Sequence, residues 1–586
     1  MKKQYKTKQN INEVDKIRHS LAHILAYAIS QIYPKTKFGI GPTTDNGFYY
    51  DFDLEKKLID KDLEKIETKM KEIIKQNIKF KKKIISKKEA KKIFKDQPYK
   101  LEIIKEKTGK EKISIYESGG FIDLCKGNHI KESRQINPEA FKLIKISGAY
   151  WKGNEKNKML TRVYGLAFNT KKELEEYIQQ EEEAKKRDHR KLGVELDIFI
   201  FSELVGAGLP LWTPKGTIIR NILDDFVWEL RKKEGYLQVD IPHLAKKDLY
   251  EKSGHWDKFK DDLFKITTRD GIVFAVKPMN CPHHTQIYAS KPRSYKELPI
   301  RYANTTKVYR DEQSGELTGI TRVRAITQDD AHVFCRRSQV KEEMRKIWNI
   351  IEKFYGTAGF SLRARLSFHD PKQPQKYLGT SKLWKEAESQ LRNLAKEKKV
   401  NVFEAKGEAA FYGPKIDFIA KDSLQREWQV ATIQLDMNMP ERFNLYCINE
   451  KGEKERIVMI HAAIMGSIER YLAILIEHYA GNFPVWLAPV QVKILAISEK
   501  HQKYAENIFQ KLKENNIRTE LTDANETLNK RIYESELQKI PYILVIGDRE
   551  IEKNSIRVRK RNSGDMGMIE IDEFIKNIKK EIEEKI

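Results

Sequence analysis

The chain has 586 residues, of which 40% are apolar, 10% aromatic and 33% charged, and its formal net charge is +25. This length is too great for one hydrophobic core, so we expect three or four globular domains. No run approaches the roughly 20 apolar residues of a membrane-spanning helix, which excludes that class of protein. The charge favours a polyanionic partner such as a nucleic acid, although a composition rich in lysine, isoleucine and asparagine also explains part of it.

The cysteines are few and widely spaced. Cys125, Cys281, Cys335 and Cys447 form no C-x-x-C pair and no dense framework. This spacing predicts a reduced protein rather than a disulfide-bonded one, and we expect it in the cytoplasm. The charged N-terminal segment is not followed by the apolar run of a secretory signal, which agrees with that expectation.

Two pairs of potential ligands lie near the N-terminus. A helical pattern over residues 14–31 contains "RHSLAHIL", which places His19 and His23 on one face of the helix. Further along, "LCKGNHI" presents Cys125 and His129 at the same spacing. Two such pairs that converge form a metal site or a polar catalytic cluster, whereas a single pair is more typical of a helix surface.

The remaining patterns divide the chain further. Residues 54–95 have a helical period rich in lysine and glutamate, and residues 171–190 alternate in charge with few apolar positions. The second of these predicts an exposed helix whose role is to link two domains. Many strand-like runs follow over residues 193–484. From residue 485 strand and helix patterns alternate, which predicts a small α/β domain with a mainly parallel sheet.

The stretch "KPMNCPHH" at residues 277–284 follows a strand-like run. Its cysteine, Cys281, is a candidate metal ligand, a candidate nucleophile or a buried core residue. The local spacing does not choose among these three interpretations.

Longer motifs resemble the threonyl-tRNA synthetases, which are class II aminoacyl-tRNA synthetases. "GPTTDNGFYYDF", "SGAYWKGNEKNKMLTRVYG" and the two ligand pairs are similar to the editing domain of that family. "KGTIIRNILDDFVWELRKKEGYLQVDIPHL" resembles motif 1, which forms the dimer interface, and "RYANTTKVYRDEQSGELTGITRVRAITQDDAHVF" resembles motif 2. "MGSIERYLAIL" is similar to motif 3, and "KPMNCP" is a signature of the family.

The resemblance implies a multidomain α+β chain. We expect an α/β editing domain at residues 1–170, a linker helix at 171–192, a class II catalytic domain with an antiparallel sheet at 193–484, and an α/β anticodon-binding domain at 485–586. The small ubiquitin-like domain that begins many bacterial members is expected to be absent. The implied function is ATP-dependent activation of L-threonine, its transfer to tRNA(Thr), and hydrolysis of mischarged Ser-tRNA(Thr), carried out by a homodimer with Mg²⁺ bound to ATP.

The motif arginines have implied roles in activation, which joins a carboxylate to the α-phosphate of ATP. Arg310 is expected to bridge these two groups, because a guanidinium binds anionic oxygens through two parallel hydrogen bonds. Arg322 is expected to bind the outer phosphates, and Arg470 to pack on adenine and pair with the γ-phosphate. Glu312 is expected to bind the adenine amino group or the tRNA end.

The resemblance also implies one zinc ion per subunit, held by Cys281, His332 and His461, with an open coordination position. Threonine and valine are nearly isosteric, and an apolar pocket separates such a pair only about a hundredfold. A zinc ion that binds both the amino group and the hydroxyl of threonine rejects valine. Asp330 is expected to accept the same hydroxyl. The other expected substrate-binding residues are Met279, Gln328, Tyr412 and Gln434. His283 stands where the family usually has glycine; it is expected to be a loop residue, with competition for the metal as the alternative.

Serine offers zinc the same two ligands, and the methyl group that it lacks is worth about 1–3 kcal/mol, so a second, hydrolytic site is needed. The residues implied for this editing site are His19, His23, Cys125, His129 and, less directly, Lys100. Whether that pocket holds a metal stays open. The residues implied to contact anticodon bases are Asn525, Glu552 and Arg561. Two alternatives are an RNA-binding regulator without enzymatic activity and a zinc hydrolase built on the H-x-x-x-H pair.

Overall fold

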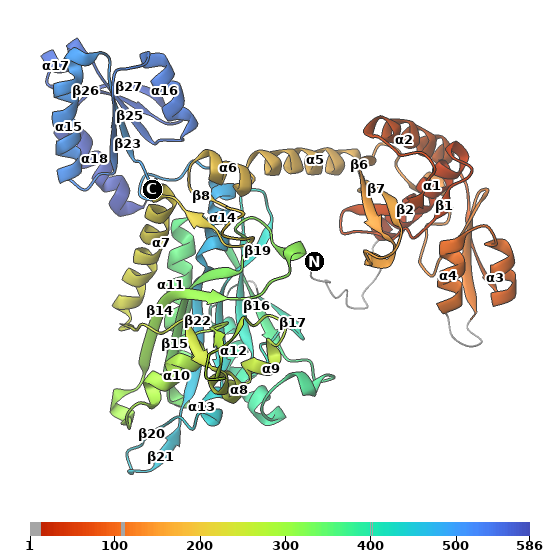
Figure 1. Cartoon of the computed structure of the whole chain (residues 1–586), viewed down its shortest axis with the longest axis horizontal. Helices are drawn as coiled ribbons and strands as arrows, with labels where there is room; N and C mark the ends of the chain where they lie inside the picture. The colour runs from red at the N-terminus through yellow and green to blue at the C-terminus, as the bar shows by residue number, and fades with distance from the viewer. Residues whose placement is uncertain (1–12, 107–111, 399, 401, 586) are drawn as a thin grey trace. The chain divides into compact units, whose positions relative to one another are not determined.

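The computed structural model describes residues 13–106, 112–398, 400 and 402–585, and divides into two compact units, residues 1–182 and 183–586 (Figure 1). Within the described residues, no helix combines the length and apolar character needed to cross a membrane.

The first unit contains a four-stranded antiparallel sheet in the order β1-β2-β7-β6. Helices α1 and α2 share one hydrophobic core with this sheet. Because apolar residues of α1 recur at helical spacing, its buried face carries His23 into the domain. The bounds are α1 Glu13–Ile32, β1 Lys37–Phe38, β2 Gly47–Asp53, α2 Asp60–Lys75, β6 Phe141–Tyr150 and β7 Met159–Ala167.

A three-stranded sheet in the order β3-β4-β5 lies in the same unit with two short helices. The prediction of continuous helix over residues 54–95 was wrong in its second half, which forms a strand and a separate helix. Antiparallel pairing of β3 with β4 outweighs the helical period of this lysine-rich stretch, because tertiary contacts override weak local propensity. The bounds are β3 Phe80–Ile85, α3 Lys87–Ile93, α4 Pro98–Glu106, β4 Ile113–Ser118 and β5 Phe121–Leu124.

The charged segment predicted as a linker helix forms two helices, α5 Lys171–Lys186 and α6 His189–Glu195. The boundary between the units falls within α5. Asp188 lies between α5 and α6 and caps the N-terminus of α6, since its side chain accepts a hydrogen bond from the Arg190 backbone N–H.

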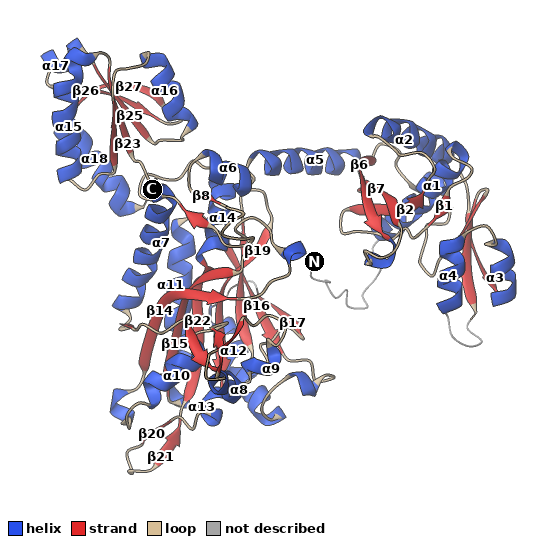
Figure 2. Cartoon of the chain, in the orientation of Figure 1, coloured by secondary structure: helices blue, strands red, loops and turns tan. Residues whose placement is uncertain are grey.

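An eight-stranded sheet dominates the second unit, in the order β10-β14-β15-β22-β19-β18-β16-β17 (Figure 2). All of its pairings are antiparallel except β10 with β14 and β16 with β17, which confirms the predicted antiparallel catalytic sheet. The strand bounds are β10 Leu237–Gln238, β14 Ile300–Tyr309, β15 Ala325–Cys335, β16 Ser361–Phe368, β17 Val402–Lys406, β18 Lys415–Lys421, β19 Glu427–Asp436 and β22 Val458–Ser467.

The two faces of this sheet carry different side chains. Ala331 and Val333 of β15 lie in the largest hydrophobic core, to which four long helices contribute most of the helical residues. Side chains alternate between faces along a strand, so Gln328, Asp330 and His332 of β15 lie together on the opposite face. The bounds of the four helices are α7 Pro214–Lys233, α11 Val340–Thr357, α12 Ser381–Lys398 and α14 Ile468–Tyr479.

Shorter elements surround the face that carries Asp330 and His332. A three-stranded sheet in the order β11-β13-β12 leads into α10, and a hairpin of β20 and β21 follows α13. The bounds are β8 Phe199–Ile200, β9 Leu211–Trp212, β11 Leu244–Lys246, α8 Lys247–Ser253, α9 His255–Lys258, β12 Lys265–Thr267, β13 Val273–Val276, α10 Cys281–Ala289, α13 Met439–Arg442, β20 Tyr446–Ile448 and β21 Lys454–Arg456.

The C-terminal part alternates strands and helices, as predicted, around a five-stranded sheet in the order β24-β23-β25-β26-β27. Three strands are parallel, but β26 and β27 form an antiparallel hairpin that the sequence analysis missed. The bounds are β23 Val492–Ala496, α15 Gln502–Glu514, β24 Thr519–Thr522, α16 Leu528–Leu537, β25 Tyr542–Ile546, α17 Asp548–Glu552, β26 Ser555–Lys560, β27 Gly564–Glu570 and α18 Ile571–Glu584.

Candidate functional site

One row of side chains crosses the eight-stranded sheet from strand to strand. His332 on β15 is the cross-strand partner of His461 on β22, and His461 is the partner of Gln434 on β19. On its other side, His332 is paired with Tyr302 on β14. Directly opposite residues have Cβ atoms about 4.5–5.5 Å apart on one face, so the strand register alone brings the two imidazoles together.

Cys281 joins the two histidines at the start of α10. Ligand atoms of Cys281, His332 and His461 all lie within 4.8 Å of one another, and all three residues are buried. His332 Nε2 lies 3.1 Å from His461 Nδ1, so these two ring nitrogens face each other. The structure therefore brings together three residues that are far apart in the sequence.

The spacing and chemistry of this group fit a zinc ion. Zinc binds imidazole nitrogen at about 2.0–2.1 Å in a tetrahedron, which places two nitrogen ligands about 3.3 Å apart. The separation of 3.1 Å between the ring nitrogens is close to that value. Burial lowers the pKa of His332, so the ring stays neutral and keeps a lone pair. Burial also raises the pKa of the Cys281 thiol, so a thiolate at this depth requires a nearby cation.

The expected substrate-binding residues lie around this group. Asp330 is buried, its Oδ2 accepts a hydrogen bond from Asn280 Nδ2 at 3.1 Å, and its Oδ1 lies 3.8 Å from His332 Nε2. The Tyr412 ring stacks on His461 with centroids 4.8 Å apart. Its hydroxyl donates to Gln434 Oε1 at 2.6 Å. Gln328 Oε1 is buried and finds no hydrogen-bond partner among the described residues, so it is available to a ligand.

The three motif arginines differ in their present partners. Arg310 donates to Met279 Sδ at 3.2 Å, and within the described part of the chain no carboxylate forms an ion pair with it. Burial lowers the pKa of this guanidinium, which favours binding of an anion that would neutralise it. Arg322 is exposed and pairs with Glu312 and Glu316 at 2.6 and 2.7 Å.

Arg470 lies in the first turn of α14, where its guanidinium carbon is 5.9 Å from the centroid of the Trp428 ring. It is exposed on the helix surface. Trp428 on β19 was not predicted as a site residue, and no local sequence signal marks it.

The second group, in the first unit, contains four of the five predicted editing residues. Ligand atoms of His19, His23, Cys125 and His129 lie within 4.8 Å of one another. Cys125 Sγ is 3.3 Å from both His19 Nε2 and His129 Nε2. A side chain at Gly127 would overlap the His19 ring, because a Cβ there would lie 2.0 Å from it. The backbone of "CKGNH" therefore approaches α1 closely enough to join the two pairs.

Lys100 lies beside this group in a buried polar chain that the sequence analysis only partly foresaw. Its ammonium forms an ion pair with Asp123, and it donates to the Tyr50 hydroxyl at 3.0 Å. The Tyr50 hydroxyl in turn donates to Asp123 Oδ2 at 2.5 Å. His23 Nε2 is 3.9 Å from the same carboxylate oxygen. Asp123 and Tyr50 were missed, since a single carboxylate and a single tyrosine in strands carry no recognisable spacing.

Burial controls protonation in the editing group. It lowers the pKa values of His19, His23 and His129, so all three rings are neutral at pH 7. It also raises the pKa of the Cys125 thiol to about 11. The group therefore presents lone pairs rather than positive charges, which suits either a proton acceptor or a metal ligand.

The expectation that His283 is a loop residue was wrong. It lies buried in the first turn of α10, next to Pro282, with its ring centroid 6.2 Å from that of Tyr250. Neither ring nitrogen has a hydrogen-bond partner among the residues that the structure describes, and burial lowers its pKa to about 4. His255, also missed, lies beside Cys281, with its Nε2 3.6 Å from Cys281 Sγ.

The predicted anticodon residues lie in different environments. Asn525 follows β24 and Glu552 ends α17, and both are exposed. Arg561 follows β26, and its guanidinium donates to the backbone oxygens of Lys539, Asn482 and Phe483. These contacts give Arg561 a structural role, and its contact with an anticodon base stays a prediction.

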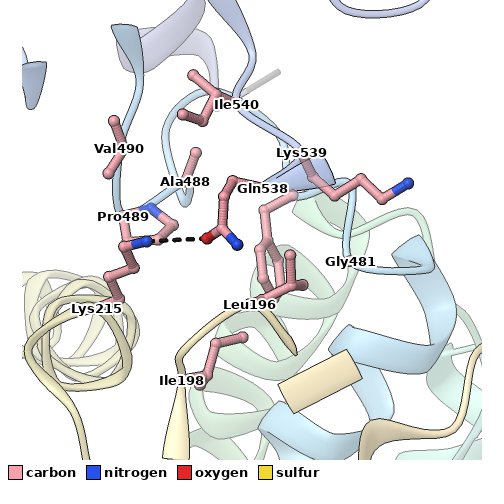
Figure 3. Close-up of a pocket in the computed structure, with 11 residues that line it drawn as sticks. Leu196, Ile198, Lys215, Gly481, Ala488, Pro489, Val490, Gln538, Lys539 and Ile540 are labelled. Atoms are coloured by element: carbon pink, nitrogen blue, oxygen red, sulfur yellow. Dashed lines mark hydrogen bonds between the residues drawn. The ribbon is translucent and has the colours of Figure 1, made fainter. Parts of the chain in front are cut away.

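Figure 3 shows a pocket where this C-terminal part meets the segments around α6 and α7 of the same unit. Lys215 donates to Gln538 Oε1 at 3.0 Å, and Gln538 Nε2 donates to the Glu195 carbonyl at 3.1 Å. The cavity volume is about 20 Å³, enough for about one water molecule, so it is not a substrate site.

Three families of known proteins match separate stretches of this chain. The family "tRNA synthetase class II core domain (G, H, P, S and T)" matches residues 264–479, and "Anticodon binding domain" matches 491–581. "Threonyl and Alanyl tRNA synthetase second additional domain" matches residues 113–164. The threonine–tRNA ligase of Caldanaerobacter subterraneus subsp. tengcongensis is 48% identical over 570 residues, which cover 97% of this chain and 87% of that protein. The chain belongs to the threonyl-tRNA synthetase family.

Another relative and a solved structure support the same family assignment. The threonine–tRNA ligase of Sulfurihydrogenibium sp. is 47% identical over 99% of this chain and 90% of its own length. The crystal structure of the RNA binding domain of threonyl-tRNA synthetase from Cryptosporidium parvum Iowa II superposes with a TM-score of 0.63 at 36% identity, over 67% of this chain and 98% of that one. The chain is thus a class II threonine–tRNA ligase with an editing domain, which uses ATP with Mg²⁺, an amino acid and tRNA.

Proposed function

We propose that this threonyl-tRNA synthetase selects L-threonine at a zinc ion held by Cys281, His332 and His461, and edits Ser-tRNA(Thr) at the histidine and cysteine group of its first unit. The observation that carries the zinc proposal is the convergence of one buried thiol and two facing ring nitrogens within 4.8 Å. Asp330 stands beside this group, with Oδ1 3.8 Å from His332 Nε2.

Zinc with three protein ligands supplies an open position for the amino group and hydroxyl of threonine. The protein then adds its own recognition of the hydroxyl, because the Asp330 carboxylate is fixed by Asn280 and can accept that proton. Asn280 occupies Oδ2, so valine would leave the buried Oδ1 of Asp330 without the hydrogen bond that the threonine hydroxyl donates, which costs more than a missing apolar contact. Met279, Gln328, Tyr412 and Gln434 form the rest of the pocket around the substrate.

Activation is assigned to the three motif arginines. Arg310 is desolvated and forms no ion pair with a carboxylate among the described residues, so we assign it the threonine carboxylate and the α-phosphate of ATP. Arg322 would exchange its ion pairs with Glu312 and Glu316 for the outer phosphates of ATP, which frees Glu312 for adenine or the tRNA end. Arg470 would pack on adenine from the start of α14. Positive charge held at these positions stabilises the developing pyrophosphate.

Editing is assigned to the neutral imidazoles of the first unit. A neutral ring of His19, His23 or His129 can take a proton from a water molecule that attacks the seryl ester. Lys100, paired with Asp123, provides a nearby positive charge for the oxyanion that forms in this step.

We further infer a homodimer of the cytoplasm that reads tRNA(Thr) through Asn525, Glu552 and Arg561. Support for the dimer comes from the segment before α7, the motif 1 helix. Large apolar side chains are exposed there, which favours an interface. These residues are Ile200, Phe201, Leu204, Val205 and Leu211. Support for the cytoplasm comes from the four cysteines, all of which are free.

The experiment that tests the proposal measures zinc content together with threonine-dependent exchange of pyrophosphate into ATP. The wild-type chain should contain one zinc ion per subunit and catalyse the exchange. The Cys281→Ser variant should lose both, whereas Cys447→Ser, which changes a buried cysteine outside the site, should keep them. Exchange without zinc in the wild type, or zinc retained in Cys281→Ser, would refute the zinc assignment.

A further inference from the structure

Two buried residues contact the ring nitrogens of His332 and His461 that do not face each other. His284, on α10, places its Nδ1 2.8 Å from His332 Nδ1. Asp436, the last residue of β19, places its Oδ2 3.0 Å from His461 Nε2. Both residues are completely buried, so no solvent competes for these hydrogen bonds. Neither residue has been given a role in the proposed function.

We propose that His284 and Asp436 are positioning residues that set the tautomers of His332 and His461 for metal binding. This inference rests on the proposed zinc site and deepens it. A neutral imidazole has one N–H and one lone pair, and only the unprotonated nitrogen can bind a metal. The outer partner of each ring therefore decides which nitrogen faces the metal position.

For His461 the assignment follows from its partner. A carboxylate only accepts hydrogen bonds, so the proton lies on Nε2, where Asp436 is the acceptor. His461 Nδ1, the nitrogen that faces His332, is then a lone pair. Asp436 cannot turn away, because its Oδ1 accepts the backbone N–H groups of Asn438 and Met439 at 2.7 and 2.9 Å.

For His332 the partner is another imidazole, so only one of the two facing Nδ1 atoms carries a proton. Metal binding through His332 Nε2 requires the proton on His332 Nδ1, with His284 Nδ1 as the acceptor. His284 then carries its own proton on Nε2. That atom is buried without a hydrogen-bond partner in the part of the chain that the structure describes. The outer N–H groups of the two histidines thus have different hydrogen-bond acceptors. The acceptor for His461 is the Asp436 carboxylate, and the acceptor for His332 is the neutral His284 ring.

Substitutions of Asp436 separate tautomer control from mere packing. In Asp436→Asn the two backbone N–H groups still require an oxygen, so the amide NH₂ must face His461 Nε2. The ring then needs its lone pair at Nε2 and its proton at Nδ1, which blocks the metal. Asp436→Ala removes more atoms but leaves either tautomer open. Asp436→Asn should therefore weaken zinc binding by about 100-fold, the upper end for outer partners of ligands, and Asp436→Ala should weaken it less.

Substitutions of His284 test the neutral acceptor. His284→Leu removes it and should weaken zinc binding about 10-fold. His284→Asn places a carboxamide oxygen near the former Nδ1 and should restore most of the affinity. The matched control is Glu388→Gln, which alters a carboxylate 2.6 Å from His369 Nδ1 away from the zinc ligands. It should leave zinc affinity unchanged.

The measurements are the dissociation constant for Zn²⁺, by competition with a chelator, and the absorption spectrum of the Co²⁺-loaded full chain. Thermal melts identify any variant that fails to fold. If His284→Leu fails to fold, the zinc affinity of His284→Asn compared with that of wild type tests the inference. Equal zinc affinity in wild type, His284→Leu and Asp436→Asn would overturn the inference, as would weaker binding in Asp436→Ala than in Asp436→Asn. A wild-type chain that binds no zinc would instead refute the proposed zinc site itself.

Discussion

Lys100→Met in the editing group is the substitution whose effect follows most directly from the structure. Lys100 and Asp123 are each only 2% exposed, and they form an ion pair. Methionine fills most of the same volume but removes the charge. Among the described residues, Asp123 then keeps the Tyr50 hydroxyl and the Leu124 backbone N–H as its donors. An uncompensated carboxylate at this depth should cost about 3–5 kcal/mol of stability.

The matched control is Lys152→Met in the same unit. Lys152 is paired with Glu102 and Glu106, but its side chain is 33% exposed. Surface pairs of this kind contribute about 0–1 kcal/mol, so the same chemical change should have little effect there. Native-state amide hydrogen exchange of α1 and β2, resolved by mass spectrometry, measures the difference within the folded full-length chain.

A double variant separates stability from editing. Lys100→Met combined with Asp123→Asn removes the unpaired charge, so protection of α1 should return close to its wild-type value. Deacylation of Ser-tRNA should stay low in both variants, while threonine-dependent pyrophosphate exchange stays normal. Equal losses of protection in Lys100→Met and Lys152→Met would refute the reasoning from burial and pairing.

Three further predictions concern both sites. His23→Ala should abolish Ser-tRNA deacylation and leave threonine activation intact; unchanged deacylation would remove His23 from the editing site. Arg310→Gln should lower kcat/KM for pyrophosphate exchange by about 100-fold or more, because two charge-assisted hydrogen bonds of about 1.5 kcal/mol or more each are lost; a loss below tenfold would contradict its role. Burial lowers the pKa values of His19, His23 and His129, so below about pH 6.5 the unfolded chain binds protons that the folded chain does not. Stability of the first unit should therefore fall as pH decreases from 7.5 to 5.5, by up to about 1.4 kcal/mol per pH unit for each ring. Amide protection that stays constant over this range, after correction for the intrinsic pH dependence of exchange, would contradict this.

The catalytic region shows how far sequence patterns reach. The alternation of Gln328, Asp330 and His332 already places them on one face of a strand, whatever the sheet around them. It does not reveal that His461 is the neighbour of His332, because that depends on the register of β15 with β22. Met279 and Cys281 could be linked to the sheet only by resemblance to a family.

In the first unit the sequence shows the two ligand pairs but not the contacts that join them. The spacing of His19 with His23 and of Cys125 with His129 was visible, but their meeting across 106 residues was not. Asp123 and Tyr50 carry no spacing that would mark them, and they are recognised only through their contacts with Lys100. The strand β3 was missed for a related reason, since its pairing partner β4 lies beyond the stretch in which it was read.

The sequence by itself determined the family, the order of the functional regions and the chemical types at each site, because these depend on residue identity and on spacings within single helices and strands. The tertiary structure alone decided which side chains support the ligands, such as His284 and Asp436 behind the two histidines. Those contacts depend on strand register and helix placement, and a hydrogen bond between residues 48 positions apart, such as that of His284 with His332, has no local signature.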